Sequence, residues 1–395
     1  MSSRRESGLL LAALSLTGLS MRTAVTSVGA VLDDVQDTLH ASGVVAGLIT
    51  TLPVICFAGL GALTPTLSRR FGAHRLLVFA LLASTAGLAL RPVWTDTASF
   101  ASLSVLALTG AAVSNVLMPS LVKAHFPERI GAMTALYVTA LAVGTTAAAG
   151  LTVPIGDAFG GWRFGLASWS MLCGIAALPW LPTVRNDNAA LDAGDAAIPL
   201  RALLRSRTAW ALTTFFATQS MQAYIAFGWF ARFLSDHGIS HASAGAMVAV
   251  LSAVGIPVSL IAPRVAARHH RPLLAFFGAC SAVSYVGLAV APVGGAWAWM
   301  VLAGIGAGMF PVALVLIALR SRTAATTATL SAFVQVIGYV IAGTGPLLFG
   351  ALFGATGSWA LPLTVLFAAL VVSLLTAWPS AADRYVDDEL ATSSQ

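Results

Sequence analysis

One arginine inside a long apolar run is the residue of this sequence best suited to chemistry. Arg22 lies in a run that extends from about Leu9 to Leu32, and Asp33 follows eleven positions later. In a helix that separation is about 16 Å, which places Arg22 near the middle of a bilayer. A charged side chain at that depth costs about 2.5 to 3.5 kcal/mol, so it normally faces a protein interior or a watery cavity. Arg22 is therefore the first candidate for a binding residue.

Small and polar side chains recur at helical spacing around Arg22. The stripe consists of Ser15, Gly18, Arg22, Thr26 and Gly29. Such a stripe is typical of close packing between helices or of a helix that lines a cavity, and the charge of Arg22 favours the cavity. Two alternatives for Arg22 stay open: it caps carbonyl groups of a broken helix, or it binds a lipid phosphate.

Other apolar runs carry amide, hydroxyl and aromatic side chains that suit a polar ligand. A guanidinium offers a planar fork of donors, which fits a small anion, a carboxylate or a nitro group. Asn115 has an equally good alternative, a hydrogen bond between helices. The expected binding set is Arg22, Thr26, Thr51, Asn115, Gln219, Gln222, Tyr224, Trp229, Gln335 and Tyr339.

Titratable groups fall outside the centres of the apolar runs. All 15 carboxylates and all seven histidines lie in expected loops, tails or helix ends. We therefore expect the substrate itself to supply the charge opposite Arg22. The sequence holds no Walker loop, metal-binding His/Cys cluster or Ser-His-Asp arrangement, and its three cysteines are isolated packing residues. We expect no enzymatic activity, no catalytic residue, no metal and no cofactor.

The composition defines the setting of these residues. Of 395 residues, 58% are hydrophobic and 9% charged, with a mean hydropathy of +0.87. These values predict an all-α membrane protein, and twelve spans of about 20 residues would leave only short loops. The net charge of +6 does not indicate a nucleic-acid partner, because the basic residues follow the positive-inside rule. Only Arg91, Arg163 and Arg232 fall in expected outer loops, with Arg91 suited to the outer interface.

This charge bias predicts a multi-pass protein of the inner (cytoplasmic) membrane with both termini in the cytoplasm. We expect a six-helix bundle over 1–182, a cytoplasmic linker over 183–207, a second six-helix bundle over 208–379 and a disordered cytoplasmic tail over 380–395. Within the linker, 198–205 would form a short amphipathic surface helix. The expected spans are 9–32, 43–65, 76–93, 99–121, 130–153, 162–182, 208–233, 242–262, 272–291, 297–318, 325–352 and 359–378.

The expected loop over 65–75 resembles, imperfectly, the signature between helices 2 and 3 of the major facilitator superfamily. Arg70 and Gly72 match that signature, whereas Arg69 replaces its Asp. The set Arg69, Arg70 and Gly72 is the candidate gating motif, and a plain anchoring loop is equally compatible. The spacing from Pro65 to Arg70 recurs from Pro263 to Arg268, which indicates two related halves.

The chain resembles the cyanate and 2-nitroimidazole transporter family within that superfamily. The resemblance rests on MRTAVTSVG at 21–29, LITTLPV at 48–54, NVLMP at 115–119 and GLTVP at 150–154. It implies a secondary transporter with pseudo-symmetric bundles, a central site between helices 1, 4, 7 and 10, and alternating access. The implied partners are a small anionic or nitro-bearing substrate, the lipid bilayer and a proton as candidate coupling ion. We expect a monomer.

In this hypothesis Arg22 neutralises the substrate, while the amides and Tyr339 complete its hydrogen bonds. Tyr224 and Trp229 would form apolar or stacking walls. Two other functions stay open. A proton-coupled drug or antibiotic exporter is favoured by the aromatic content of 208–233 and opposed by the acid-free core. A non-transporting membrane sensor is opposed by the shortness of the loops.

Overall fold

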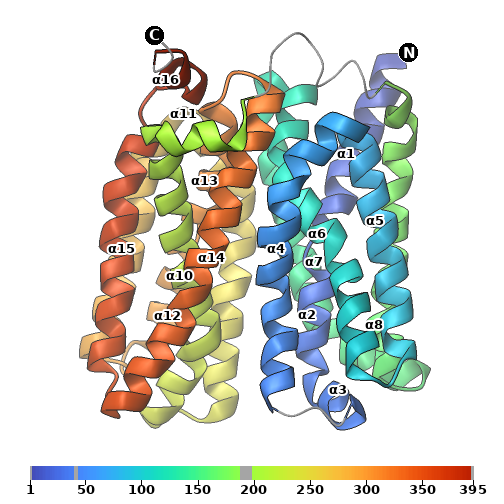
Figure 1. The fold of residues 1–395 in the computed structure, drawn as a ribbon. Helices are drawn as coiled ribbons and strands as arrows, with labels where there is room; N and C mark the ends of the chain where they lie inside the picture. Colours follow the sequence, from blue (N-terminus) through green and yellow to red (C-terminus); the bar gives the residue numbers. More distant parts are fainter. Residues whose placement is uncertain (1, 40–42, 187–197, 393–395) are drawn as a thin grey trace. The chain divides into compact units, whose positions relative to one another are not determined.

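The long apolar runs of the sequence form helices in the computed structural model, which describes residues 2–39, 43–186 and 198–392 (Figure 1). No strand occurs within these ranges. The chain divides into two compact units. Unit 1 comprises Met1–Glu128, Leu136–Ala197 and Thr323–Ala328, and unit 2 comprises Arg129–Ala135, Ile198–Arg322 and Thr329–Gln395.

Unit 1 is built from helices in which small residues allow close packing. A Cβ at Gly87 of α5 would collide with the backbone of Ala107 on α6, so glycine is required where these two helices touch. The α-helices of the N-terminal part are α1 (Ser2–Ser20), α2 (Thr23–Ala30), α3 (Leu32–Leu39), α4 (Gly43–Phe71), α5 (Ala73–Leu90), α6 (Thr97–His125), α7 (Ile130–Phe159) and α8 (Trp162–Ala177). Short 3-10 helices lie at η1 (Arg91–Val93), η2 (Pro127–Arg129) and η3 (Leu178–Asn186).

Unit 2 contains one very long helix that bends in its middle. In α11 the backbone of His269 is non-helical, with φ −129° and ψ 51°, so this kink separates the two spans expected at 242–262 and 272–291. The elements of this part are η4 (Leu200–Arg205), α10 (Arg207–Asp236), α11 (His241–Val290), α12 (Ala296–Gly306), α13 (Met309–Leu319), α14 (Ala324–Thr356), α15 (Ala360–Ser380) and α16 (Val386–Thr392).

Ten segments of the described chain are long and apolar enough to cross a membrane. Two facts bring this number into line with the twelve expected spans. The amides of α10 keep that helix out of the ten, and the kinked α11 is counted as one segment although it has two arms. The described chain therefore has the all-α fold of twelve spanning helices that the sequence predicts.

The expected loop over 65–75 is wrong. Helix α4 continues through Pro65 to Phe71, and α5 begins at Ala73, so a single residue joins the two helices. Gly72 has a φ of 90°, a conformation that favours glycine because it has no Cβ. The chain reverses at this one residue, which leaves Arg69 and Arg70 on the last turn of α4.

The prediction of a disordered tail is also wrong within the described residues. Helix α16 forms, and Glu389 accepts hydrogen bonds at 2.6 Å from the hydroxyls of Ser206 and Thr208 at the start of α10. Asp388 forms an ion pair with Arg322 at 2.8 Å. The acidic residues of the tail were expected to be solvated, but Glu389 binds two hydroxyls and Asp388 binds a guanidinium. Of the expected linker, 187–197 lies outside the described residues.

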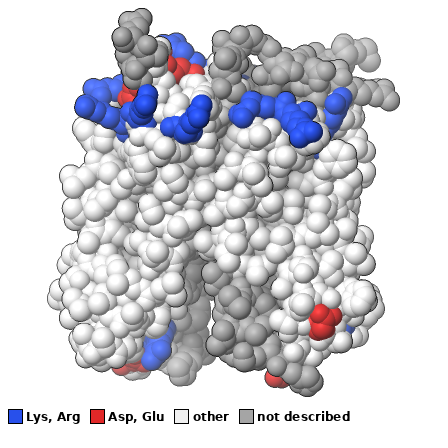
Figure 2. Space-filling view, viewed as in Figure 1, with Lys and Arg blue, Asp and Glu red and all other residues white. Residues whose placement is uncertain are grey.

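Within the described part of the linker, the expected amphipathic segment forms η4, a 3-10 helix. Its Leu203 is fully buried and its Arg201 is exposed, while Leu204 is also exposed, so its exposed side is not purely polar. Figure 2 shows most of the visible lysine and arginine side chains gathered at one end of each unit. Each unit is therefore asymmetric in charge along its helices.

Candidate functional site

The first spanning helix is broken at Arg22. Helix α1 ends at Ser20, α2 begins at Thr23, and Arg22 occupies the N-cap position of α2. The backbone carbonyl of Arg22 accepts hydrogen bonds from the amides of Val25 at 3.1 Å and Thr26 at 3.0 Å. The single helix expected over 9–32 is therefore two helices, and the stripe of small and polar residues is divided between them.

Close packing and hydroxyl groups accompany the break. A Cβ at Gly18 would collide with the carbonyl oxygen of Tyr137 on α7, so this part of the stripe serves helix packing rather than a cavity. The hydroxyl of Ser20 donates to Thr17 O and that of Thr23 donates to Ser20 O, both at 2.9 Å. These bonds satisfy carbonyl groups where the helical ladder is interrupted.

The guanidinium of Arg22 lies in an environment that favours electron-rich groups. Its carbon atom is 5.2 Å from the centre of the Phe57 ring on α4, within the range of a cation–π contact. The N-terminus of α2 adds the positive pole of a helix dipole at the same place. The hydroxyl of Thr26 turns back to Arg22 O at 3.0 Å. Charge and dipole together suit an anion or a nitro group.

A second arginine, Arg91, is hydrogen-bonded to α2. Arg91 is 1% exposed, so the expectation that it lies at the outer interface is wrong. It donates to Ala24 O and to the hydroxyl of Ser27, both at 3.1 Å. Its Nε has no hydrogen-bond partner among the described residues. Sequence reasoning missed this residue because an arginine at the end of an apolar run normally indicates an interface.

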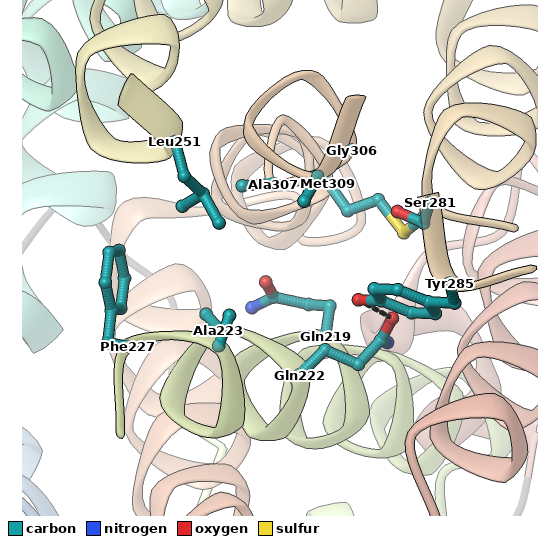
Figure 3. Close-up of a pocket in the computed structure, with 12 residues that line it drawn as sticks. Gln219, Gln222, Ala223, Phe227, Leu251, Ser281, Tyr285, Gly306, Ala307 and Met309 are labelled. Atoms are coloured by element: carbon teal, nitrogen blue, oxygen red, sulfur yellow. Dashed lines mark hydrogen bonds between the residues drawn. The ribbon is translucent and has the colours of Figure 1, made fainter. Parts of the chain in front are cut away.

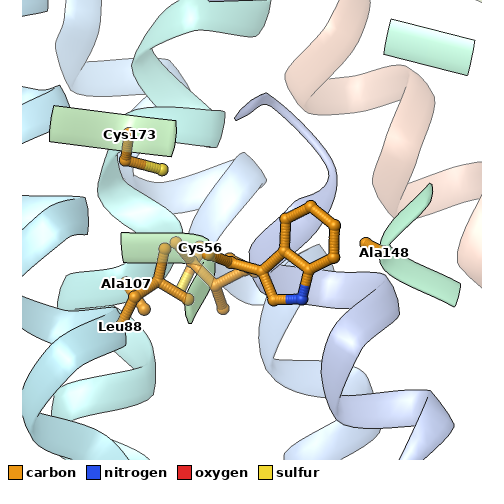
Figure 4. Close-up of a cluster of buried hydrophobic side chains, with 8 residues drawn as sticks. Cys56, Leu88, Ala107, Ala148 and Cys173 are labelled. Atoms are coloured by element: carbon orange, nitrogen blue, oxygen red, sulfur yellow. The ribbon is translucent and has the colours of Figure 1, made fainter. Parts of the chain in front are cut away.

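An apolar cluster supports the same side of α2. Ala24 packs there with two cysteines, Cys56 and Cys173, and with Trp169 (Figure 4). The Trp169 indole donates to the hydroxyl of Thr152 at 2.9 Å, which satisfies its one polar group. All three cysteines of the chain are buried and free, as expected for packing residues. The cluster gives α2 a rigid support.

The other candidates of unit 1 are more dispersed. Asn115 lies buried in α6 at 6% exposure. The side chain of Thr51 lies outside the described residues. Arg69 and Arg70 are exposed; Arg69 donates to the Thr66 hydroxyl and Arg70 lies over the ring of Phe71. These contacts are local to the end of α4 and do not reach Arg22.

Unit 2 holds a small cavity that is partly open to its surroundings (Figure 3). Its walls come from α10, from both arms of α11, and from α12 and α13 with their junction. The side chains around it are apolar or uncharged. They are Gln219, Gln222, Ala223, Ala226, Phe227, Leu251, Ser281, Tyr285, Ala303, Gly306, Ala307 and Met309.

The cavity lies at a second break in a spanning helix. Helix α12 ends at Gly306 and α13 begins at Met309. A Cβ at Gly306 would collide with the hydroxyl of Ser281, and one at Gly308 would come within 2.5 Å of the Phe277 ring. Glycine is needed here because the α12–α13 junction touches α11 so closely.

Three polar side chains in the cavity have defined hydrogen-bond partners. The Tyr285 hydroxyl donates to Gln222 Oε1 at 3.0 Å, and Gln222 Nε2 donates to Thr218 O at 3.1 Å. Gln219 Nε2 donates to Phe216 O at 3.1 Å and contacts the Ser220 hydroxyl at 2.6 Å. The amide orientations follow from chemistry, because a backbone carbonyl only accepts hydrogen bonds.

Of the six residues expected from α10 and α14 in unit 2, Gln219 and Gln222 line this cavity. Gln335 donates to the Ser331 hydroxyl at 2.7 Å and Tyr339 packs against Phe216. Trp229 donates to Pro346 O at 3.1 Å, and Tyr224 is partly buried on α10. These four residues are not among those that line the cavity.

Sequence reasoning missed the residues that α11 and α13 contribute. Ser281, Tyr285 and Met309 line the cavity, and Tyr285 is buried. The signal was present, because Ser281 and Tyr285 are polar residues four positions apart in an apolar run. The same spacing had identified Gln335 and Tyr339.

The comparisons with known proteins agree with this architecture. An uncharacterized transporter of Bacillus subtilis, YycB, is 34% identical over 391 residues, covering 96% of this chain and 95% of that protein. The 2-nitroimidazole transporter of Escherichia coli is 32% identical over 376 residues, 93% of each chain. The cyanate transport protein CynX of the same organism is 28% identical over 353 residues, 89% of this chain and 91% of CynX.

The fold and its apolar spans define a multi-pass membrane transporter. The structure of the proton:xylose symporter XylE superposes with a TM-score of 0.76 at 13% identity and covers all of both chains. The sequence model of the Major Facilitator Superfamily matches residues 11–346. The chain belongs to the Major Facilitator Superfamily, and the resemblance to cyanate and 2-nitroimidazole transporters is confirmed.

Proposed function

We propose that this transporter is a secondary active carrier that moves a small anionic or nitro-bearing molecule across the inner membrane by alternating access. The observation that carries the proposal is the position of Arg22 at the break between α1 and α2. Relatives over nearly the whole length are named for 2-nitroimidazole and cyanate, which present a nitro group and a small anion.

The physical basis is the sum of two positive sources at one place. A guanidinium stays protonated and offers planar paired donors, which match the two oxygens of a nitro or carboxylate group. Broken helices in transporters direct the positive pole of a half-helix at anionic groups of the substrate. Arg91 and the cluster around Trp169 hold α2, and so keep this pole in position.

The membrane setting and the coupling belong to the same proposal. The gathering of basic residues at one end of each unit supports an orientation with both termini in the cytoplasm. We propose a monomer with a proton as coupling ion. An external pH change on addition of substrate to proteoliposomes measures this coupling, and transport without any pH change would contradict it.

Transport into proteoliposomes tests the function with labelled cyanate and labelled 2-nitroimidazole. Arg22→Gln should lower uptake roughly a hundred- to several-thousandfold, because removing one member of a charged interaction at depth costs about 3 to 5 kcal/mol. Arg201→Gln is the matched control, since Arg201 is exposed on η4. Uptake by Arg22→Gln at the wild-type rate would contradict the proposal.

A further inference from the structure

Two hydrogen-bond acceptors of defined orientation, Gln219 Oε1 and the Tyr285 hydroxyl oxygen, line the cavity of unit 2. We propose that this cavity receives a neutral N–H donor of the substrate, and that Gln219 Oε1 is the acceptor. The inference rests on the transport function proposed above and adds a second requirement. Besides the acceptor group assigned to Arg22, the substrate carries a hydrogen-bond donor.

The first step is the orientation of Gln219. Its Nε2 lies 3.1 Å from Phe216 O, and because that carbonyl only accepts, the atom facing it is the amide nitrogen. The Ser220 hydroxyl takes a second contact from the same nitrogen at 2.6 Å. No donor is recorded for Gln219 Oε1 within the described part of the chain. Figure 3 shows this amide projecting from α10 into the cavity.

The second step fixes Gln222 in the same way. Its Nε2 faces Thr218 O at 3.1 Å, so its Oε1 is the atom 3.0 Å from the Tyr285 hydroxyl. An amide oxygen cannot donate, so the Tyr285 hydroxyl must donate to it and has only lone pairs to offer a ligand. Tyr285 is thus a positioning residue for Gln222 and a second acceptor.

The lining of the cavity is uncharged and partly apolar. Among the described residues no lysine, arginine or histidine lines the cavity, so an anion here would meet only neutral donors, such as the second N–H of Gln222 and the Ser281 hydroxyl. A neutral ring N–H would satisfy Gln219 Oε1, while Phe227, Leu251 and Met309 would contact the faces of a flat ring. A bare anion such as cyanate carries no donor and does not meet this requirement.

A pair of probes that differ in one N–H tests the inference on the purified full chain. Calorimetry would compare 2-nitroimidazole with 1-methyl-2-nitroimidazole, which keeps the ring and nitro group and loses the donor. Wild type should bind the N–H compound about tenfold more tightly, the loss expected for one unsatisfied hydrogen bond. Gln219→Met should reduce this preference to less than twofold.

Three further variants complete the test. Gln219→Glu keeps acceptor oxygens and should retain the preference, which keeps the test decisive if Gln219→Met fails to fold. Tyr285→Phe frees the Gln222 amide and should reduce the preference about threefold. Thr213→Val removes a buried hydroxyl on the same helix, bonded to Ala209 O and outside the cavity, and should leave the preference unchanged.

The outcomes separate this inference from the proposed function. Equal binding of both probes by wild type, with binding lost in Arg22→Gln, would overturn the donor requirement and keep the function. A tenfold preference retained in Gln219→Met would overturn the role of Gln219. Uptake of cyanate without binding of either probe would also overturn the inference. Failure to bind either probe together with failure to carry cyanate would contradict both.

Discussion

In the described part of this transporter two spanning helices are broken, one at a charged residue and the other at a glycine-containing junction. The break between α1 and α2 in unit 1 holds Arg22, a permanent cation beside the N-terminus of a short helix. The break between α12 and α13 in unit 2 is made by Gly306, Ala307 and Gly308, and it lines an uncharged cavity. The first break carries a positive charge, and the second lines a small uncharged cavity.

The two breaks are also stabilised differently. Around Arg22, the hydroxyls of Ser20 and Thr23 donate to nearby carbonyls in addition to backbone bonds such as that from Met21 N to Thr17 O at 3.1 Å. At the second break the backbone satisfies itself, because the amide of Gly308 bonds Ile305 O at 3.0 Å. Irregular backbone at membrane depth is tolerated where such partners exist or where it lines a cavity. Both breaks therefore keep a hydrogen-bonded backbone, and they differ in the charge that they carry.

The largest effect is expected from changing the form of the charge at the first break. Arg22→Lys keeps the positive charge but loses the planar fork of donors, and hydrogen bonds to charged groups are worth about 1.5 to 3 kcal/mol. We expect the KM for transport to rise roughly ten- to a hundredfold, with a smaller change in kcat. Initial uptake rates over a range of substrate concentrations give both values, and an unchanged KM would show that a point charge is sufficient.

The second break should be sensitive to a single methyl group. Gly306→Ala should destabilise unit 2 by about 1 to 3 kcal/mol, the usual result of overpacking, because its Cβ would collide with the Ser281 hydroxyl. Adding Ser281→Ala should recover part of the loss, since the two sites are coupled. Thermal unfolding in detergent measures both variants.

The control for that prediction is Gly255→Ala on α11, where a Cβ meets no atom within 4 Å. An alanine there should leave stability unchanged or raise it by up to about 1 kcal/mol. Equal destabilisation by both glycine substitutions would contradict the close-contact explanation of the second break.

A moderate effect is expected from the arginine bonded to α2. Arg91→Met removes two hydrogen bonds to α2. It also removes a buried charge, and replacing buried charges by apolar residues is often neutral for stability. We expect the thermal midpoint to stay within a few degrees while transport falls about fivefold. Arg75→Met, an exposed substitution on the same helix, should change neither value. A large loss of stability with normal transport per folded molecule would contradict a positioning role for Arg91.

The smallest effect lies away from both breaks, at the tail. Burial acts to raise the pKa of Glu389, but hydrogen bonds from Ser206 and Thr208 outweigh it and hold that pKa below its usual value. The carboxylate therefore stabilises the docking of α16 above the unfolded pKa of about 4.3, and this contribution is lost as the pH falls through the lower folded pKa.

Glu389→Gln mimics that loss at neutral pH and should weaken docking of α16 by about 1 kcal/mol. Hydrogen exchange of the amides over 386–392 should accelerate, while Glu128→Gln, at an exposed carboxylate, should leave this exchange unchanged. Unchanged exchange in Glu389→Gln would indicate that Asp388 and Arg322 hold the helix by themselves.

The helical architecture was predictable because hydropathy acts over whole spans. Even α10, which carries several amides, was identified from its pattern, and the family was recognisable from segments such as 21–29. The breaks were harder to identify, because contacts of a few residues determine them and the hydropathy of the whole span does not. The apolar run of 9–32 left a broken helix open only as an alternative interpretation of Arg22, and it did not indicate that the helix stops at Ser20, beside a close contact of Gly18 with α7.

The candidate residues show the same limit. Gln219 and Gln222 were found because polar residues on one face of a helix stand out, but their hydrogen bonds to Phe216 O and Thr218 O depend on rotamers. The burial of Arg91 depends on three helices meeting at one place, which a single run of sequence does not show. The order of α16 likewise depends on partners far away in the chain.

Calorimetric titration of 2-nitroimidazole into purified Arg22→Gln tests the central claim most directly, which is that the charged break binds the substrate. Wild type and Arg201→Gln should bind the compound with similar affinity. Arg22→Gln should remain folded, with a normal thermal midpoint, and should show no measurable heat of binding. Binding by Arg22→Gln within threefold of the wild-type affinity would contradict the account.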